Sequence, residues 1–439
     1  MKMDTTVADL LHLVGWKAVS SVEYPEKRTI EIHLERDENF PCLCHRCGDR
    51  LRAKRGIYRS KVRHLPIFGF EVWLIFWRQK RHCPICNKAR SEQVPFLADE
   101  SPHLTTEYVF WAAKIMEIST PTRVAELVNL DEVTAWRIEY RHLKKLKRDY
   151  KIPQPKRIAV DEVYARKKNL YRGESRKEKF FTIIVDIDRK KVLWVSEGRK
   201  KEALDEFFKI IGPSGCAEIK SVATDEFDEF RQSIEEYCPK AKHVYDKFHF
   251  LRNFGDAVND ARNFLFKTAV PGTVARRKSA PKYKYNFIKR AENRTEEESQ
   301  DLKDVMESNK MFCTLELIKE RVLTMFDVGI SVEEAKRIFN EVGKWIFEAG
   351  FPSLKKWYRR TSRIWSKIEN YFTERVTSAI SEGINNVIKS LKRRAYGYKD
   401  MEYFKLKIMQ VAGYLKSRFF PNGKFDLLDG SKLIPISEG

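Results

Sequence analysis

Three carboxylates that are far apart in the chain, Asp161, Asp225 and Glu382, are the residue type that a two-metal phosphodiester site requires. Asp161 ends the apolar run 158–160, and Asp225 ends the run 221–224, so each aspartate is expected at the end of a β-strand. Glu382 stands in a stretch with helical periodicity. Magnesium prefers oxygen ligands, and two ions about 4 Å apart can hold both the attacking and the leaving oxygen. The three carboxylates are therefore candidate ligands of two Mg²⁺ ions, with Mn²⁺ as an alternative.

The elements around the two aspartates predict a mixed sheet covered by helices. Alternating and apolar runs indicate five strands, at 157–164, 180–187, 191–196, 219–224 and 242–245. The polar turn 188–190 predicts an antiparallel hairpin of the second and third strands, and helices are expected over 200–211 and 228–237. If the strand of Asp161 is central and lies beside the strand of Asp225, the two carboxylates converge. Bound cations would then offset their mutual repulsion.

The helical wheel of the stretch 377–395 places Glu382 on a polar face. The apolar face is expected to hold Ile380, Ile384, Val387 and Leu391. The polar face holds Glu382 together with Asn386, Lys389 and Arg393, which are candidate DNA-binding residues. A solvated helix face is the alternative interpretation. Other carboxylates compete for the same roles, namely Glu162, Asp186, Glu226, Asp228 and Glu374.

Asp246 and His249 follow the predicted strand 242–245 of the same sheet and are further candidate catalytic residues. A histidine at this place could lie near the scissile phosphate or bond to a DNA oxygen. Its alternative role is to satisfy a helix terminus.

Two CxxC pairs, Cys44 with Cys47 and Cys83 with Cys86, predict one structural zinc site. Each pair can present two thiolates, and four thiolates complete a tetrahedral Zn²⁺ without an open position for catalysis. The alternation of apolar residues over 70–76 predicts a strand, so a hairpin would bring the pairs together. Three nearby side chains compete for one coordination position, namely Cys42, His45 and His82.

A helix, a tight turn and a second, basic helix are predicted between Thr120 and Arg148. Thr120 and Asp131 are the expected N-caps, and Pro121 occupies the first helical position. The second helix is expected to bury Val133, Trp136, Tyr140 and Leu143. Its cations Arg137, Arg141, Lys144 and Arg148 would then enter the major groove of DNA, as in a helix-turn-helix. A plain helical hairpin with a solvated basic face is the alternative.

The formal net charge of +22 favours a polyanionic partner. Nucleic acid is preferred over a membrane, because no segment offers about 18 uninterrupted apolar residues. No basic-then-apolar leader is visible, so a cytoplasmic location is expected. A second stretch, 276–287, interleaves aromatic residues with cations and is a weaker candidate for DNA contact.

The expected fold class is multidomain α+β. The predicted order is a strand and zinc-binding module at 1–100, a helix-turn-helix domain at 101–150, the first part of a catalytic core at 156–264, an all-helical insertion at 265–372, the closing helices of the core with Glu382 at 373–420, and a tail at 421–439.

Together these motifs resemble the ISL-three family of bacterial insertion-sequence transposases over nearly the whole chain. The resemblance rests on the CxxC pairs with 65–69 between them, on 160–162, on Thr224-Asp225, on 246–249, on 382–389 and on 392–398. It implies an RNase-H-like DDE domain interrupted by a helical insertion, and it assigns the three catalytic positions to Asp161, Asp225 and Glu382. A bacterial, nucleoid-associated location follows from the same resemblance.

The expected function is that of a DNA transposase, which cuts at the terminal inverted repeats and joins the freed 3′-hydroxyl to target DNA. Asp161 would bridge both metal ions, and Asp225 and Glu382 would each complete one. The partner is double-stranded DNA, and at least a homodimer is expected because two ends must be paired. The alternatives are a non-catalytic DNA-binding regulator and a Mg²⁺-dependent nuclease without strand transfer.

Overall fold

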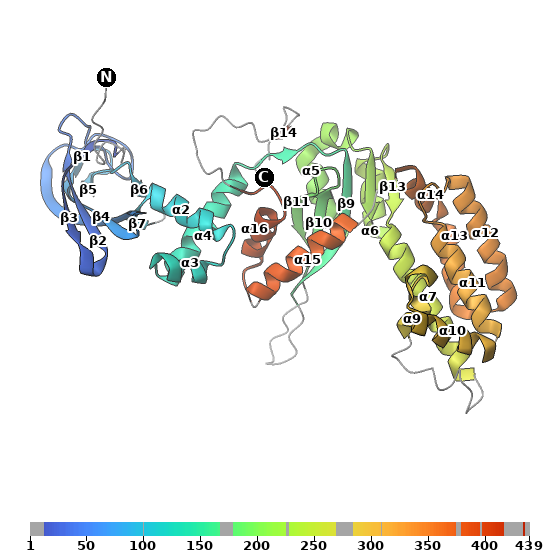
Figure 1. Ribbon diagram of the computed structural model, residues 1–439. Coiled ribbons are helices and arrows are strands. Elements are labelled where there is room, and N and C mark those ends of the chain that lie inside the picture. The colour runs from blue at the N-terminus through green and yellow to red at the C-terminus, as the bar shows by residue number, and fades with distance from the viewer. Residues whose placement is uncertain are drawn as a thin grey trace, which may run out of the picture. The chain divides into compact units, whose positions relative to one another are not determined.

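The computed structural model describes residues 13–99, 101–166, 179–224, 228–268, 284–308, 310–374, 379–395, 397–416 and 433–434. The chain divides into two compact units (Figure 1), of which the first comprises residues 1–149 with 415–424 and the second residues 150–414 with 425–439. Both contain helices and a mixed sheet, so the expected α+β class is confirmed. Within the described ranges, every helix is either too short or too polar to cross a bilayer.

The first unit is built on a mixed sheet that the sequence patterns revealed only in part. Its strands are β1 (Trp16–Tyr24), β2 (Thr29–Arg36), β3 (Lys54–Ile67), β4 (Phe70–Cys83), β5 (Lys88–Ser91), β6 (Leu97–Ala98) and β7 (Ser101–Thr105). Their order is β1-β2-β4-β3-β7-β6, and β5 pairs with β4. Trp16, Phe76 and Phe96 meet edge-to-face in the core, with ring centroids 4.8 to 6.3 Å apart.

The long hairpin of β3 and β4 turns at Phe68 and Gly69. Both residues have positive φ, 49° and 81°, as the type I′ turn of a two-residue hairpin loop requires. Gly69 adopts this conformation without a Cβ clash, while the Phe68 side chain is almost fully exposed. The strand expected over 70–76 is therefore confirmed, and it extends to Cys83.

Three helices follow the sheet, α2 (Thr106–Met116), α3 (Pro121–Val128) and α4 (Glu132–Arg148). The expected N-caps are confirmed, because Thr120 accepts a bond from the Arg123 N–H and Asp131 one from the Thr134 N–H. Asn129, with φ of 51°, ends α3 in the left-handed conformation.

The predicted apolar stripe of α4 is wrong at Val133 and Trp136, whereas Tyr140 is half-buried and Leu143 is buried. Val133 and Trp136 are exposed, while Ala135 and Ile138 are fully buried. The reason is the close packing of α4 against α2 and α3, where small side chains such as Ala112 and Ala125 fill the core. That interface accepts Ala135 and leaves the larger indole of Trp136 outside.

The second unit contains a five-stranded sheet in the order β11-β10-β9-β12-β13. Its strands are β9 (Arg157–Arg166), β10 (Lys179–Asp186), β11 (Lys191–Glu197), β12 (Ser221–Thr224) and β13 (Lys242–Tyr245), and a separate pair is formed by β8 (Ile152–Pro153) and β14 (Leu433–Ile434). The hairpin of β10 and β11 and the central place of β9 beside β12 are confirmed. β9, β12 and β13 are parallel to one another, whereas β10 is antiparallel to both of its neighbours, β9 and β11.

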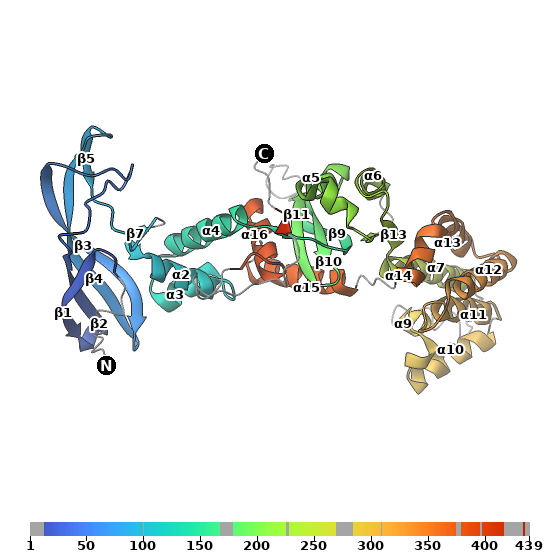
Figure 2. The same ribbon diagram turned by 90° about the horizontal axis from the view of Figure 1, so that it is seen from above.

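This sheet is covered by helices that precede and follow a long helical region in the sequence (Figures 1 and 2). They are α5 (Lys201–Ala217), α6 (Asp228–Tyr237), α15 (Ala379–Arg394) and α16 (Met401–Val411). α15 lies against β9, and α16 packs on β11. Phe404 of α16 also meets Phe181 of β10. Gly413 allows the chain after α16 to approach β11, because a Cβ there would lie 2.5 Å from the Val192 carbonyl oxygen.

The helical region between β13 and α15 has an aromatic core around Trp357 and Phe339. Its helices are α7 (Lys247–Thr268), α9 (Lys284–Ile288), α10 (Glu296–Ser308), α11 (Lys310–Thr324), α12 (Val332–Ala349), α13 (Pro352–Arg363) and α14 (Trp365–Glu374). α14 returns to the sheet, and its Asn370 side chain donates to the carbonyl of His243 on β13 at 2.8 Å. The helical region thus follows β13 in the chain, and its last helix packs against β13 again.

Candidate functional site

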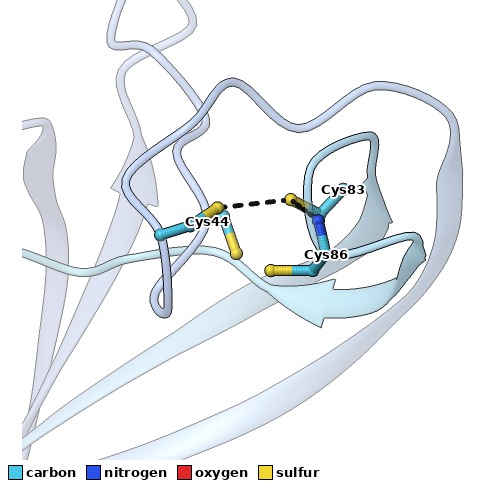
Figure 3. Close-up of side chains that lie close together, drawn as sticks. Cys44, Cys83 and Cys86 are labelled. Atoms are coloured by element: carbon cyan, nitrogen blue, oxygen red, sulfur yellow. Dashed lines mark hydrogen bonds between the residues drawn. The ribbon is translucent and has the colours of Figure 1, made fainter.

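Four cysteines of the first unit form a cluster that could hold a metal ion. One sulfur each from Cys44, Cys47, Cys83 and Cys86 lies within 4.8 Å of the other three. Cys83 ends β4, so the hairpin carries it to the loop that holds Cys44, and the sulfurs turn toward one another there (Figure 3). The Cys47 and Cys83 sulfurs are 3.4 Å apart. Four soft sulfur ligands suit a closed tetrahedral site.

The thiols of Cys44 and Cys47 shift each other's pKa in opposite directions. Burial raises the pKa of Cys44, but the N–H groups of Cys47 and Arg46 act against it and bring the pKa down to about 7. The Asp49 N–H lowers the pKa of Cys47, yet burial and the three neighbouring sulfurs outweigh it and raise that pKa to about 12. Like charges at this spacing resist joint ionisation, and a dication in their midst removes the conflict.

Three residues that could compete for a place in the cysteine cluster, Cys42, His45 and His82, are not part of it. Cys42 lies 3.6 Å from a carboxylate oxygen of Glu92, and the ring of His45 bonds to the carbonyl of Ser91 at 3.0 Å. Neither these two nor His82 belongs to the group of potential ligands found among the described residues.

Asp161 lies in the middle of β9, which corrects the expectation that it follows a strand. β9 continues to Arg166, and Asp161 is paired there with Ile183 of β10. The pairing with β12 on the other side stops earlier, at Ala159 opposite Ala223. Pairing with β10 extends β9 beyond its pairing with β12. Asp161 therefore has a strand partner on the β10 side and none among the described residues on the β12 side.

Helix α15 contacts this aspartate directly. The Asn385 side chain donates to Asp161 Oδ2 at 2.7 Å, and the Glu162 N–H donates to Oδ1 at 2.7 Å. Lys392, two turns later, donates to the carbonyl of Tyr164 at 3.0 Å. The carboxylate of Asp161 is thus held by both its own strand and α15.

A small cavity gathers polar groups at the same place. It is lined by Ala159, Val160, Asp161, Ala223, Thr224, Asp246, His249 and Ser381. Asp246 is nearly buried, and its Oδ1 accepts the Phe248 N–H at 2.9 Å, so this side chain caps the start of α7. His249 Nε2 is 3.7 Å from Asp246 Oδ2. The structure brings Asp161, Asp246 and His249 around one cavity.

The other two candidate carboxylates are Glu382 and Asp225. Glu382 is exposed on α15, next to Ser381 and one turn before Asn385. Asp225 lies outside the described residues and directly follows Thr224, the last residue of β12.

Several of the competing carboxylates are placed away from the cavity. Glu374 forms an ion pair with Lys242 at 2.7 Å, at the beginning of β13, whereas Asp246 follows the end of that strand. Asp186 pairs with Arg189 at 2.7 Å and lies opposite Ile158, at the beginning of β9. Glu162 follows Asp161 on one strand and therefore points to the other face of the sheet. Glu226 lies outside the described residues.

The outer face of α15 agrees with the helical wheel except at one position. Val387 is 39% exposed and Ile388 is buried, so the apolar face is rotated slightly from the predicted one. Asn386, Lys389 and Arg393 are exposed. On α4, the four cations Arg137, Arg141, Lys144 and Arg148 are exposed as well.

Comparison with known proteins places this geometry in a family. A transposase family model of the ISL3 DDE type matches residues 158–408, a range that begins in β9 and ends in α16. The chain belongs to the ISL3 family of DDE transposases. This ISL3 member is 26% identical over 400 residues to the transposase for insertion sequence element IS1001 of Bordetella parapertussis, covering 90% of this chain and 96% of that protein. It is 24% identical to the transposase for insertion sequence element IS1557 of Mycobacterium tuberculosis, covering 84% and 86% respectively.

Two polar residues at the site of this ISL3-family chain were not singled out from the sequence: Ser381, which lines the cavity, and Asn385, which bonds to Asp161. The signal for Asn385 was its spacing, because a residue three positions after Glu382 lies on the same side of a helix. For Ser381 the sequence offered no signal beyond its place next to Glu382.

Proposed function

We propose that the chain is a DNA transposase that binds the terminal inverted repeats of its insertion sequence and performs Mg²⁺-dependent strand cleavage and strand transfer. The observation that carries the proposal is the bond between Asn385 and Asp161. It joins the helix of the third carboxylate to the central strand of the first, across the whole helical region. Membership in the family supports the same chemistry.

The oxygen donors around Asp161 suit hard cations. Parallel pairing of β9 and β12 ends at Ala159 and Ala223, and Asp161 and Asp225 each come two residues later. Asp225, which lies outside the described residues, is therefore kept as the second candidate ligand. Glu382, one turn before Asn385 on α15, is the third candidate ligand. Asp161 would be shared by two Mg²⁺ ions, and Asp225 and Glu382 would each hold one.

When bound, the two ions would activate the attacking water or 3′-hydroxyl and stabilise charge on the leaving oxygen. The side chains around the site would orient its ligands and bind the DNA. Asn385 fixes the orientation of the Asp161 carboxylate through its 2.7 Å bond. His249, at 3.7 Å from Asp246, would donate to a phosphate oxygen. Exposed Asn386, Lys389 and Arg393 on α15 would bind the DNA backbone near the cavity.

The arrangement of the second unit supports an RNase-H-like core with a helical insertion. β9 is central, with the hairpin of β10 and β11 on one side and the parallel strands β12 and β13 on the other, and the helices from α7 to α14 separate β13 from α15. The insertion begins and ends at β13, so it can interrupt the sequence without interrupting the sheet.

The first unit would supply recognition of the transposon ends. Its cysteine cluster would hold one structural Zn²⁺. α3 and α4 would form a helix-turn-helix, with the cations of α4 in the major groove. Because two ends must be brought together for transfer, the active complex would contain at least two copies of the chain on DNA.

The test is a cleavage assay with the full chain and a duplex that contains one terminal repeat of the element. We expect a cut at the repeat end with Mg²⁺ or Mn²⁺ and none with a chelator. Specific binding without any cut would support a regulator instead. Cutting without joining of the freed 3′-hydroxyl to target DNA would support a nuclease.

A further inference from the structure

The exposed face of α4 carries large apolar side chains between its cations. Val133 is 60% exposed and Trp136 is 40% exposed. Residues three and four apart lie on one face of a helix, so Val133, Trp136 and Tyr140 share the face of Arg137 and Arg141. Ala135 and Ile138, on the other side, provide the contact with the core. Val133 and Trp136 therefore lie outside this core contact.

These side chains are ordered into a row along the helix. The rings of Trp136 and Tyr140 are 5.1 Å apart between centroids, and the Lys144 ammonium lies 4.2 Å from the centroid of Tyr140. Aromatic contact and a cation–π contact thus hold the side chains together. A preformed row loses little conformational freedom when it binds a partner.

The charges of α4 argue for nucleic acid as that partner. After Glu132 in the first turn, the only acid on the helix is Glu139, and its side chain is fully buried. Beyond the first turn, the exposed side chains of the helix itself are therefore cations and apolar or neutral groups, and the C-cap residue Asp149 pairs with Arg148 at 3.1 Å. A protein partner of ordinary mixed charge would not require this composition, whereas a DNA groove lined by phosphates does.

The apolar groups also have the position along α4 that reads bases. In a recognition helix, the N-terminal residues contact base edges and later residues contact the backbone. Val133 and Trp136 lie in the first two turns after the cap Asp131, while Arg148 is the last residue. In the major groove, the 5-methyl group of thymine is the apolar feature that such side chains can contact.

We propose that Val133 and Trp136 of α4 determine sequence specificity by contacting thymine methyl groups in the terminal repeats. This inference rests on the proposed function and adds a direct-readout role to it. Arg137 and Arg141 flank the apolar groups, and Arg148 contacts phosphate.

The test compares two duplexes that differ only in methyl groups. Binding of the full chain to a labelled terminal repeat is measured by fluorescence anisotropy, with thymine or with deoxyuridine at every thymine position. We expect the wild-type chain to bind the deoxyuridine duplex about tenfold more weakly. Trp136→Ala should bind the thymine duplex more weakly and lose most of the preference for thymine, with the remainder supplied by Val133, and Trp136→Phe should restore part of it.

Arg148→Ala on the same helix is the matched control. It should weaken both duplexes equally, keep the preference for thymine, and reduce the salt dependence by about one counterion. Zinc content and circular dichroism verify that each variant is folded.

Each outcome has a distinct meaning. Specific binding of the ends with no effect of the methyl groups would overturn the inference and leave the proposed function standing. No preference for the ends over random DNA would overturn the proposed function itself. If Trp136→Ala alters the oligomeric state and not the methyl preference, the face binds protein and the inference is wrong.

Discussion

The cysteine cluster and the carboxylate site differ in how the fold assembles them. Cys83 and Cys86 reach the loop of Cys44 and Cys47 through one antiparallel hairpin, and all four sulfurs meet in one unit. The carboxylate site instead joins β9 to α15, across 224 positions between Asp161 and Asn385. A local hairpin closes a site at a small cost in chain entropy, while a long-range site depends on the whole sheet and its helices. The first is thus expected to fail by loss of metal and the second by loss of alignment.

The largest expected effect concerns the cysteine cluster. Cys83→Ser removes a ligand that is fully buried, so bound zinc should fall from about one per chain to almost none, with loss of structure in the first unit. Metal analysis and thermal unfolding measure both. Cys42→Ser is the matched control, because Cys42 lies outside the cluster, and it should keep its zinc. Equal zinc content in the two variants would mean that the cluster does not bind zinc.

The next effect distinguishes two glutamates. Glu382→Gln should reduce cleavage about 10³-fold or more, because a metal ligand is lost. Glu374→Gln should leave cleavage unchanged and lower the free energy of unfolding by no more than about 1 kcal/mol, since it loses only the ion pair with Lys242. The measurement is the rate at which each variant cleaves a terminal-repeat duplex. If the loss occurs in Glu374→Gln instead, the assignment of the third carboxylate is wrong.

A smaller effect is expected when only the alignment of Asp161 is disturbed. Asn385→Ala removes the bond to Asp161 Oδ2 and should lower cleavage about 10- to 100-fold, with a higher Mg²⁺ concentration needed for half-maximal rate. Ser390→Ala, at an exposed position of the same helix, should change neither. A lower rate with unchanged Mg²⁺ dependence would indicate a role for Asn385 other than positioning the ligand.

The smallest effect is a dependence of the second unit on pH. Burial lowers the pKa of His243 to about 3, while its ring nitrogen bonds with the Thr224 hydroxyl at 2.7 Å. The folded state then binds fewer protons than the unfolded state, whose histidine has a pKa near 6.5, so stability decreases as the pH falls. Between pH 7 and 5 this amounts to about 2 kcal/mol.

Chemical unfolding of wild type and His243→Gln at both pH values measures that contribution. The variant should be less dependent on pH in this window. An identical pH dependence in the two proteins would show that His243 is not the responsible group.

What could be predicted from the sequence follows the same division between local and long-range features. The cysteine pairs, the caps at Thr120 and Asp131, and the hairpin of β10 and β11 depend on neighbours in the chain, and all were identified correctly. The exposed, basic first half of β3 shows no apolar alternation, and so most of the first sheet was missed.

Features that depend on distant packing were harder to predict. The buried side of α4 is decided by the space between α2 and α3, which the size of Trp136 does not fit. The extension of β9 beyond Asp161 depends on its pairing with β10, and the contact of Asn385 with Asp161 depends on how α15 returns to the sheet. A pattern along the sequence carries no information about such distances.

The central claim is that one carboxylate site around Asp161 performs divalent-metal-dependent strand transfer. The most direct measurement joins a pre-cut transposon end, with its free 3′-hydroxyl, to a plasmid target in Mg²⁺, using wild type and Asp161→Asn. Both proteins should bind the end equally in a parallel binding assay. The account predicts joined products for wild type and none for the variant. Joined products with Asp161→Asn at the wild-type level would contradict it.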